Sequence, residues 1–593
     1  MSVSRTLVAA ALVCAGFALP ATASAERSEL PASTPAGPFA DVIKSVVTID
    51  APLPEEVGPV PAACQQLRYL RYRRDGGPAD PQQADAVLVI MPGTLAGAGS
   101  LEMHALQVVQ NAADRGRSVE YWALDRRGNC IEDRTGLDAG LDANDPKIAL
   151  DYYYRGLQVG GRTFGGIQKT GQLGYVADFD LRQVTEDYRA VITEGLPDPE
   201  FRRSRTFCGG HSLGGALTGL LMAWDFDNDP ATRDDAGYDL CAGSIALDSS
   251  VALTPETAAA GAGAQIAKAI VGQTVRSVRN AVAANIIPRT FDFGVIGPET
   301  MLLLEGIGLN AQLNPETDAA PLVAATPPTP AVDGAMRLLQ SRTWQDAVAR
   351  TPRLRRQHLS GEALLGAFMD DNSQPLSFIK TSIGSYTGGA LLPKIFPFTD
   401  GPLMFYPVED AKPYGWAGHL EPQSTARRGD GRLYTTAASE VTDPQDLARV
   451  LHGAPLDFLE QYYSTMLTVD SVLAGAGSRD GDFARLRYTD AALGKPRLSV
   501  IAGDGLGQAK QPAGVPGVPS VVEVLPGYDH VDVITASPRQ SSGQPERSAK
   551  ATTDFVLDHT GRDPPASSCP PNWVSKLAVC SISFTIETSP SPR

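Results

Sequence analysis

The chain has 593 residues, of which 43% are hydrophobic and 20% are charged, an ordinary globular composition with room for more than one structural unit. Its formal net charge of -16 disfavours nucleic acid as a partner and disfavours electrostatic binding to an anionic membrane surface. The charge does not exclude a neutral ester or amide as substrate, and the sequence gives no indication of the oligomeric state.

Residues 1–25 are predicted to be a signal peptide. Arg5 precedes an apolar run at 6–19, and the Ala-Ser-Ala at 23–25 supplies the small residues of a cleavage site. The run is shorter than the ~20 apolar residues that span a bilayer, which disfavours a membrane anchor. We therefore expect a secreted protein, extracellular or periplasmic, without integral membrane association.

Predicted strands and helices alternate through the first part of the chain. After a Pro- and Ala-rich leader at 30–38, strands are predicted at 43–49, 67–73, 86–91, 119–124 and 244–247, and helices at 101–115 and 178–194. The run A-V-L-V-I-M at 86–91 is apolar throughout, which is typical of a strand covered on both faces. The alternation predicts a mainly parallel sheet flanked by helices.

A second structural unit interrupts this pattern. Residues 251–495 contain Ala-rich helical stretches, a Pro-rich break and few buried strand patterns. Apolar strand patterns return at 498–502 and 521–525, and a helix is predicted at 547–559. The predicted organisation is a core made of residues 26–250 and 496–562, a mainly helical cap insertion at 251–495, and a Pro- and Ser-rich tail at 563–593.

Six cysteines remain after the predicted signal peptide is removed, and an even number in an exported chain predicts disulfides. Six cysteines allow 15 connectivities, so position along the chain must choose among them. Cys569 and Cys580 lie close together in the tail and are the first expected pair. Cys208 and Cys241 lie next to neighbouring predicted strands and are the second, which leaves Cys64–Cys130 as the third by elimination.

The segment T-F-C-G-G-H-S-L-G-G-A-L-T-G at 206–219 contains the most informative motif. An apolar, strand-like stretch leads into Gly210, Ser212 and Gly214, and small, helix-compatible residues follow. A strand, the pattern G-x-S-x-G and a helix form a nucleophile elbow, which exposes a serine hydroxyl above the sheet. Glycine is needed on both sides because a Cβ would collide with the flanking strand or helix. The alternative is a glycine-rich turn with an idle serine.

A serine nucleophile needs a neighbouring base, and the base needs an orienting group. His530 lies in a loop just past the last predicted strand, at the rim of the sheet where the elbow is expected. Asp504 lies between two glycines just past the preceding strand, and the order Ser212, Asp504, His530 is the expected one. Asp248, after the strand at 244–247, is the alternative acid.

An oxyanion hole requires two N–H donors directed at the charge that develops in the transition state. Leu213, directly after the serine, is predicted to supply one backbone N–H. Thr94, in the loop M-P-G-T-L at 91–95, is predicted to supply the other. Loss of one such donor costs about 3–4 kcal/mol of transition-state stabilisation.

The elbow sequence G-H-S-L-G-G at 210–215 is similar to that of lipases and esterases, and the chain resembles the α/β-hydrolase superfamily over 43–250 and 496–559. The resemblance implies an α/β fold with an eight-stranded, mostly parallel sheet, and acyl transfer to water through an acyl-enzyme. Asp504 has the commoner position of the family acid, whereas some relatives place the acid where Asp248 stands. Pro92-Gly93 replaces the His-Gly of many relatives.

The sequence therefore predicts a secreted serine hydrolase of esterase or lipase type that acts on a small-molecule or lipid-like ester. A peptidase or amidase with the same triad is the second interpretation, and a non-catalytic binding protein on a hydrolase scaffold is the third. No cofactor and no metal are predicted. Asp225, Asp227 and Asp229 alternate like the start of an EF-hand, but Pro230 and Ala236 replace its glycine and glutamate.

Overall fold

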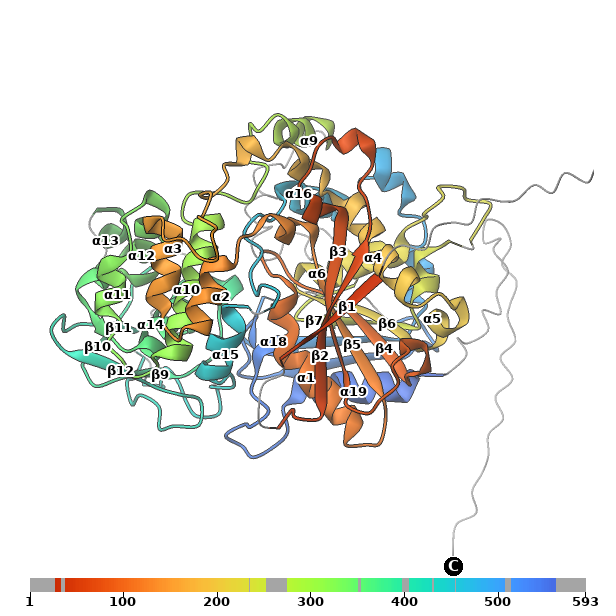
Figure 1. Cartoon of the computed structure of the whole chain (residues 1–593). Helices are drawn as coiled ribbons and strands as arrows, with labels where there is room; N and C mark the ends of the chain where they lie inside the picture. The colour runs from red at the N-terminus through yellow and green to blue at the C-terminus, as the bar shows by residue number, and fades with distance from the viewer. Residues whose placement is uncertain are drawn as a thin grey trace, which may run out of the picture.

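Two lobes make up the molecule, a sheet-based core and a mainly helical second lobe (Figure 1). The predicted signal peptide, the tail and the Cys569–Cys580 pair lie outside the residues that the structure describes. Among the described helices, none is long and apolar enough to cross a membrane. The computed structural model describes residues 27–33, 38–233, 235–251, 275–349, 353–396, 405–428, 431–453, 455–506 and 514–561.

A nine-stranded sheet in the order β1-β2-β3-β5-β4-β6-β7-β13-β14 forms the core. From β5 to β14 all neighbouring strands are parallel, and β1, β2, β3 and β5 pair antiparallel. The strands are β1 (Arg27–Ala32), β2 (Val42–Asp50), β3 (Gln66–Arg74), β4 (Ala86–Met91), β5 (Val119–Asp125), β6 (Thr206–His211), β7 (Gly243–Leu247), β13 (Arg497–Ala502) and β14 (Ser520–Leu525).

Helices cover both faces of this sheet, because every residue of β4, β5, β6, β7 and β13 is buried. One helix group packs α1 against α18 and α19, and another packs α4 against α6. The predicted alternation of strands and helices in the core is confirmed. The core helices are α1 (Glu102–Ala113), α4 (Leu181–Gly195), α5 (Pro199–Arg205), α6 (Leu213–Ala223), α18 (Asp532–Thr535) and α19 (Arg547–His559).

Strand β1 is the one core strand that the sequence pattern did not predict. It lies where a Pro- and Ala-rich leader was expected and pairs antiparallel with β2. Its Glu29 accepts hydrogen bonds from Ser45 Oγ (2.6 Å) and Arg71 Nη1 (3.0 Å), so polar contacts, not apolar alternation, hold this edge strand. The sheet therefore has nine strands where eight were expected.

The second lobe draws on two separate segments of the chain. Helices α2 and α3 precede the predicted insertion, yet they pack against α10 within that insertion. Leu137, Tyr152 and Leu302 belong to one apolar cluster shared by the two segments. Helices α2 and α3 thus belong in sequence to the predicted first part of the core and in space to the second lobe, because an apolar helix face does not reveal in sequence which body it packs on. The helices from these two segments are α2 (Thr135–Asp142), α3 (Pro146–Arg155), α9 (Val275–Ala283), α10 (Pro298–Leu313), α11 (Ala320–Ala325), α12 (Pro330–Gln340), α13 (Trp344–Ala349), α14 (Gly361–Met369), α15 (Pro444–Leu451), α16 (Thr465–Gly475) and α17 (Thr489–Leu493).

Parts of the insertion also pack on the core. Helix α16 contacts α4, and α17 contacts α6. Two small sheets complete the insertion, so it is not wholly helical. Their strands are β8 (His358–Leu359), β9 (Ser385–Thr387), β10 (Leu391–Pro393), β11 (Phe405–Pro407) and β12 (Pro413–Ala417).

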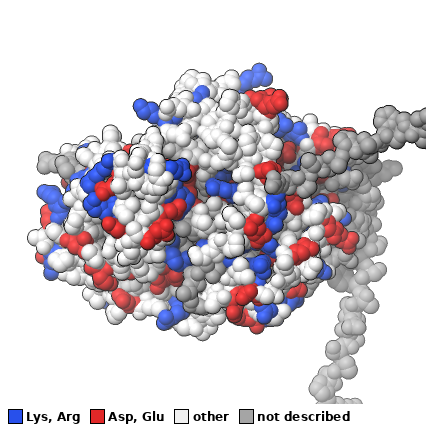
Figure 2. Space-filling model, viewed as in Figure 1, with Lys and Arg blue, Asp and Glu red and all other residues white. Residues whose placement is uncertain are grey.

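Charged side chains of both signs are interspersed on the face of the molecule shown in Figure 2. The net charge of -16 is therefore not gathered into one single-sign patch on that face. A mixed surface of this kind supports solubility without creating a strong local field.

Two of the predicted disulfides are confirmed. Cys64 pairs with Cys130, with their Cα atoms 5.0 Å apart, and Cys208 pairs with Cys241, with their Cα atoms 5.7 Å apart. The second bond joins Cys208, within β6, to Cys241, two residues before β7. It thus closes the connection that contains α6.

Replacing both Cys208 and Cys241 by alanine is expected to lower the free energy of unfolding by about 2–5 kcal/mol, because the cross-link restrains a 33-residue separation in the unfolded chain. Chemical denaturation of the oxidised proteins measures the difference. As a control, reductant should lower the wild-type midpoint more than that of the double variant, which retains one disulfide fewer. Equal midpoints for the two oxidised proteins would contradict the assignment.

Candidate active site

Ser212 stands at a strained turn between β6 and α6. Its backbone has φ 53° and ψ -124°, a conformation that a non-glycine residue rarely adopts. Its N–H donates to Leu247 O on the neighbouring strand β7 (3.0 Å). A Cβ at Gly210 would overlap the backbone of Gly214, and a Cβ at Gly214 would overlap the carbonyl of Met91. The geometry is that of the predicted nucleophile elbow, including its need for both glycines.

His530 is buried in the loop between β14 and α18 and pairs with Asp248. The His530 Nδ1 to Asp248 Oδ2 distance is 2.5 Å. The Asp248 side chain is fully buried and also accepts backbone N–H bonds from Ala502 to Oδ1 (3.1 Å) and from Leu506 to Oδ2 (3.1 Å). Asp248, which follows β7, thus accepts from three donors in two segments: the end of β13 with the loop after it, and the loop of His530.

Asp504, the acid that we favoured from the sequence, is not the partner of His530. It is exposed, its N–H donates to Tyr528 O (3.0 Å), and among the described residues no hydrogen bond joins its carboxylate to His530. The loop that carries Asp504 wraps around Asp248 instead: a Cβ at Gly505 would lie 2.5 Å from Asp248 Oδ2. The structure thus pairs His530 with Asp248, the alternative acid, and not with Asp504, and the approach of Gly505 to Asp248 explains the glycine after Asp504.

His211, the residue before Ser212, packs against the ring of His530. The ring centroids lie 4.5 Å apart, and His211 Nε2 donates to the backbone carbonyl of His530 (2.9 Å). Burial and the neighbouring His530 lower the pKa of His211 well below its usual value, so this ring stays neutral. His211 therefore fixes the loop of His530 beside the elbow, a role that the sequence did not reveal.

The loop after β4 touches the elbow directly. A Cβ at Gly93 would lie 2.9 Å from the Cβ of Ser212, so this position must be glycine. Leu213 is the first residue of α6, and the first N–H groups of a helix have no partner within it. The two predicted oxyanion donors, Thr94 and Leu213, thus belong to segments that meet at the serine.

Arg126 binds the backbone carbonyls of the loop after β4. Its guanidinium donates to the carbonyls of Pro92 (2.7 Å), Gly93 (2.6 Å) and Ala96 (2.7 Å), and its Nε donates to Glu460 Oε2 (2.7 Å). Arg126 is 5% exposed and Glu460 is 2% exposed. Sequence reasoning missed both residues, because they are separated by 334 positions and follow no motif.

Residues 457–463, which we call the buttress segment, extend the support from the insertion. Gly97 N–H donates to Phe458 O (2.8 Å), Gly99 N–H donates to Asp457 O (3.0 Å), and Glu460 N–H donates to Leu95 O (2.9 Å). The insertion therefore contributes backbone pairing to the loop after β4. A cap that only covered the site would not form these backbone hydrogen bonds with the loop.

The acidic loop considered for calcium is held together by its own backbone. Asp227 accepts from the N–H of Asp229 (2.7 Å), and Asp229 accepts from the N–H of Ala231 (2.9 Å). Buried Asp225 pairs with Arg487 at 2.5 Å. These contacts explain the spacing of the carboxylates without an EF-hand.

The substitution Arg126→Ala is expected to lower the free energy of unfolding by about 3–5 kcal/mol, because it leaves the Glu460 carboxylate buried without its cation. Arg117→Ala is the matched control: it breaks a half-exposed ion pair with Asp85 (2.9 Å) and should cost less than about 1 kcal/mol. Equilibrium denaturation compares the two variants. Equal costs would show that the Arg126 cluster does not stabilise the loop.

No protein-family model and no curated protein matches the chain. Among solved structures, it is similar to a candidate lipase from Sulfolobus solfataricus (13% identity over 90% of this chain and 98% of that one, TM-score 0.38). It is also similar to epoxide hydrolase A from Mycobacterium thermoresistibile (13% identity, 82% and 94% covered, TM-score 0.29). The strand order and the elbow between β6 and α6 are those of the α/β-hydrolases, and the chain has the α/β-hydrolase fold.

Proposed function

We propose that the protein is a secreted serine hydrolase that cleaves carboxylic esters of small or lipid-like molecules through an acyl-enzyme. Ser212 is the nucleophile, His530 is the general base and then the general acid, and Asp248 orients His530. The observation that carries the proposal is the 2.5 Å hydrogen bond between His530 and Asp248, formed beside a serine at a strained strand-to-helix turn.

Asp248 determines which ring nitrogen of His530 carries the proton. An ionised carboxylate can only accept, so Nδ1–H donates to Asp248 and Nε2 keeps a free lone pair. In the proposed mechanism that lone pair takes the hydroxyl proton as Ser212 Oγ attacks the ester carbonyl. The backbone N–H groups of Ala502 and Leu506 hold this carboxylate beside His530, where it stabilises the imidazolium.

The imidazolium next gives its proton to the departing alkoxide, and the acyl group stays on Ser212 Oγ. Water then attacks the acyl carbon while His530 takes a water proton, and collapse releases the carboxylic acid and returns the proton to Ser212. The negative oxygen of both tetrahedral intermediates needs N–H donors, for which we propose the backbone of Leu213 and Thr94.

A serine nucleophile favours acyl substrates over epoxides and haloalkanes. Attack by Ser212 Oγ on a saturated carbon would leave an ether, which has no carbonyl for water to attack. The ester of an acyl-enzyme has that carbonyl, and the same base activates the water that hydrolyses it. Only acyl chemistry therefore returns Ser212 to its starting state.

Two observations support export. The predicted signal peptide precedes the first described strand, and the described residues contain two disulfides. Disulfides form and persist in oxidising compartments such as the periplasm and the extracellular space.

Ser212→Ala is expected to reduce kcat by about 10⁴–10⁶-fold without loss of the fold, because it removes the hydroxyl that forms the proposed acyl-enzyme. The assay compares short-, medium- and long-chain p-nitrophenyl esters with aminoacyl and peptidyl p-nitroanilides. A fluorophosphonate should label the wild type and not the variant. Retained turnover in purified Ser212→Ala would contradict the proposal, and hydrolysis of anilides alone would make the protein a peptidase.

Replacement of the two candidate acids separates their roles. Asp248→Asn is expected to lower kcat by about 10⁴-fold, because an amide at that position favours the wrong tautomer of His530. Asp504→Asn removes an exposed carboxylate two residues before Leu506 and should stay within a few-fold of the wild type. The reverse pattern in the same ester assay would assign the acid to Asp504.

A further inference from the structure

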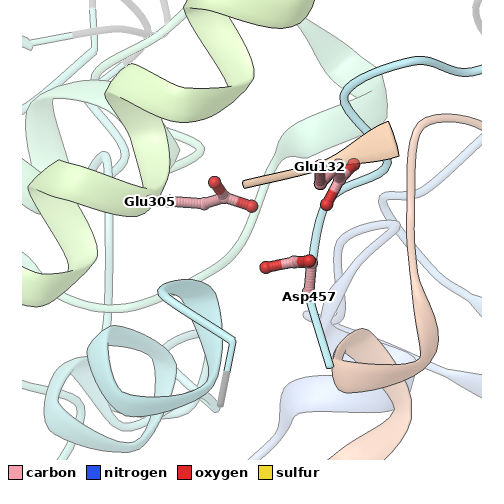
Figure 3. A group of neighbouring side chains, drawn as sticks. All are labelled: Glu132, Glu305 and Asp457. Carbon is pink, nitrogen blue, oxygen red and sulfur yellow. The ribbon is translucent and has the colours of Figure 1, made fainter. Parts of the chain in front are cut away.

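Three carboxylates that the proposed mechanism does not use converge where the second lobe meets the core. Glu132 follows β5 in the core, Glu305 lies on α10, and Asp457 begins the buttress segment. One oxygen of each lies within 4.8 Å of the others, and Figure 3 shows the three side chains directed toward a common space.

Two of these carboxylates present oxygens that nothing in the described residues satisfies. Glu132 Oε2 and Glu305 Oε1 are buried and have no hydrogen-bond partner. Their other oxygens are occupied by one residue: Gln461 N–H donates to Glu132 Oε1 (2.5 Å), and Gln461 Nε2 donates to Glu305 Oε2 (2.9 Å). Glu305 is 0% exposed. A buried oxygen without a donor is costly unless an ion or a proton compensates it.

The local charge is not balanced by the protein. Arg134 pairs with Asp457 and also with the exposed Asp138, whereas Arg126 is paired with Glu460 and Arg68 with Asp125. Three carboxylates and one guanidinium leave a formal charge of -2 when all are ionised. This formal charge is buried together with the two oxygens that lack a hydrogen-bond donor, so a bound cation would compensate both.

We propose that Glu132, Glu305 and Asp457 bind one divalent cation, and that Ca²⁺ is the ion that fits. The donors are all carboxylate oxygens, which Ca²⁺ prefers and which soft metals do not. A charge of +2 neutralises the cluster, and water completes the coordination shell. The bound ion would join three segments: the chain after β5, helix α10 and the buttress segment, which pairs with residues 95–99.

The test uses the whole mature protein, freed of metal with a chelator. Isothermal titration with CaCl₂ is expected to show one ion per chain, and Ca²⁺ is expected to raise the unfolding midpoint by a few degrees.

Glu305→Gln is expected to abolish both the heat of Ca²⁺ binding and the rise in midpoint. Without Ca²⁺ it should be at least as stable as the wild type, because an amide needs no proton to be buried neutral. Asp227→Asn is the matched control: it removes a carboxylate from another acidic group, formed by Asp225, Asp227 and Asp235, and should keep the full response to Ca²⁺.

Two results would overturn the proposal. Wild-type protein that shows neither heat nor a midpoint shift at millimolar Ca²⁺ would mean that the three carboxylates bind no calcium. A response that is lost in Asp227→Asn and kept in Glu305→Gln would assign the ion to the acidic loop.

Discussion

The buried ion pair between Arg126 and Glu460 is the interaction on which the candidate site depends. A loop that turns its N–H groups toward a substrate turns its carbonyls toward the protein, where they need donors. Arg126 supplies donors to three such carbonyls, and Glu460 neutralises its charge. The planar guanidinium suits this task because its N–H groups have fixed directions, whereas a lysine would offer one mobile point charge.

The origin of Glu460 changes how the insertion should be understood. Leu459 and Glu460 pair with Ala96 and Leu95, so the loop after β4 is completed by residues that lie hundreds of positions later. Removal of the insertion would leave Arg126 buried without its carboxylate and would expose the unpaired edge of the loop. The insertion therefore supports the loop after β4 directly. Any movement of the cap must involve elements other than the buttress segment.

The sequence predicted what local constraints determine. Gly210 and Gly214 are required by contacts within the elbow itself, and the apolar run of β4 needs no partner to be recognised. The acid was not determined locally, because Asp248 and Asp504 follow neighbouring parallel strands whose ends lie about 5 Å apart. What selects Asp248 is the backbone of Ala502 and Leu506 around it, a contact that chain order does not contain.

The buttress segment carries two buried carboxylates, of which one lies in a charge-balanced pair and the other in a cluster with excess negative charge. Glu460 meets its counter-ion Arg126, whereas Asp457 meets Arg134 within a cluster that still lacks two positive charges. Because both residues belong to one short segment, repulsion at the cluster would displace the backbone that pairs with Leu95 and Gly99. Neutralisation of the cluster by the proposed cation would therefore help to keep this loop in place beside Ser212.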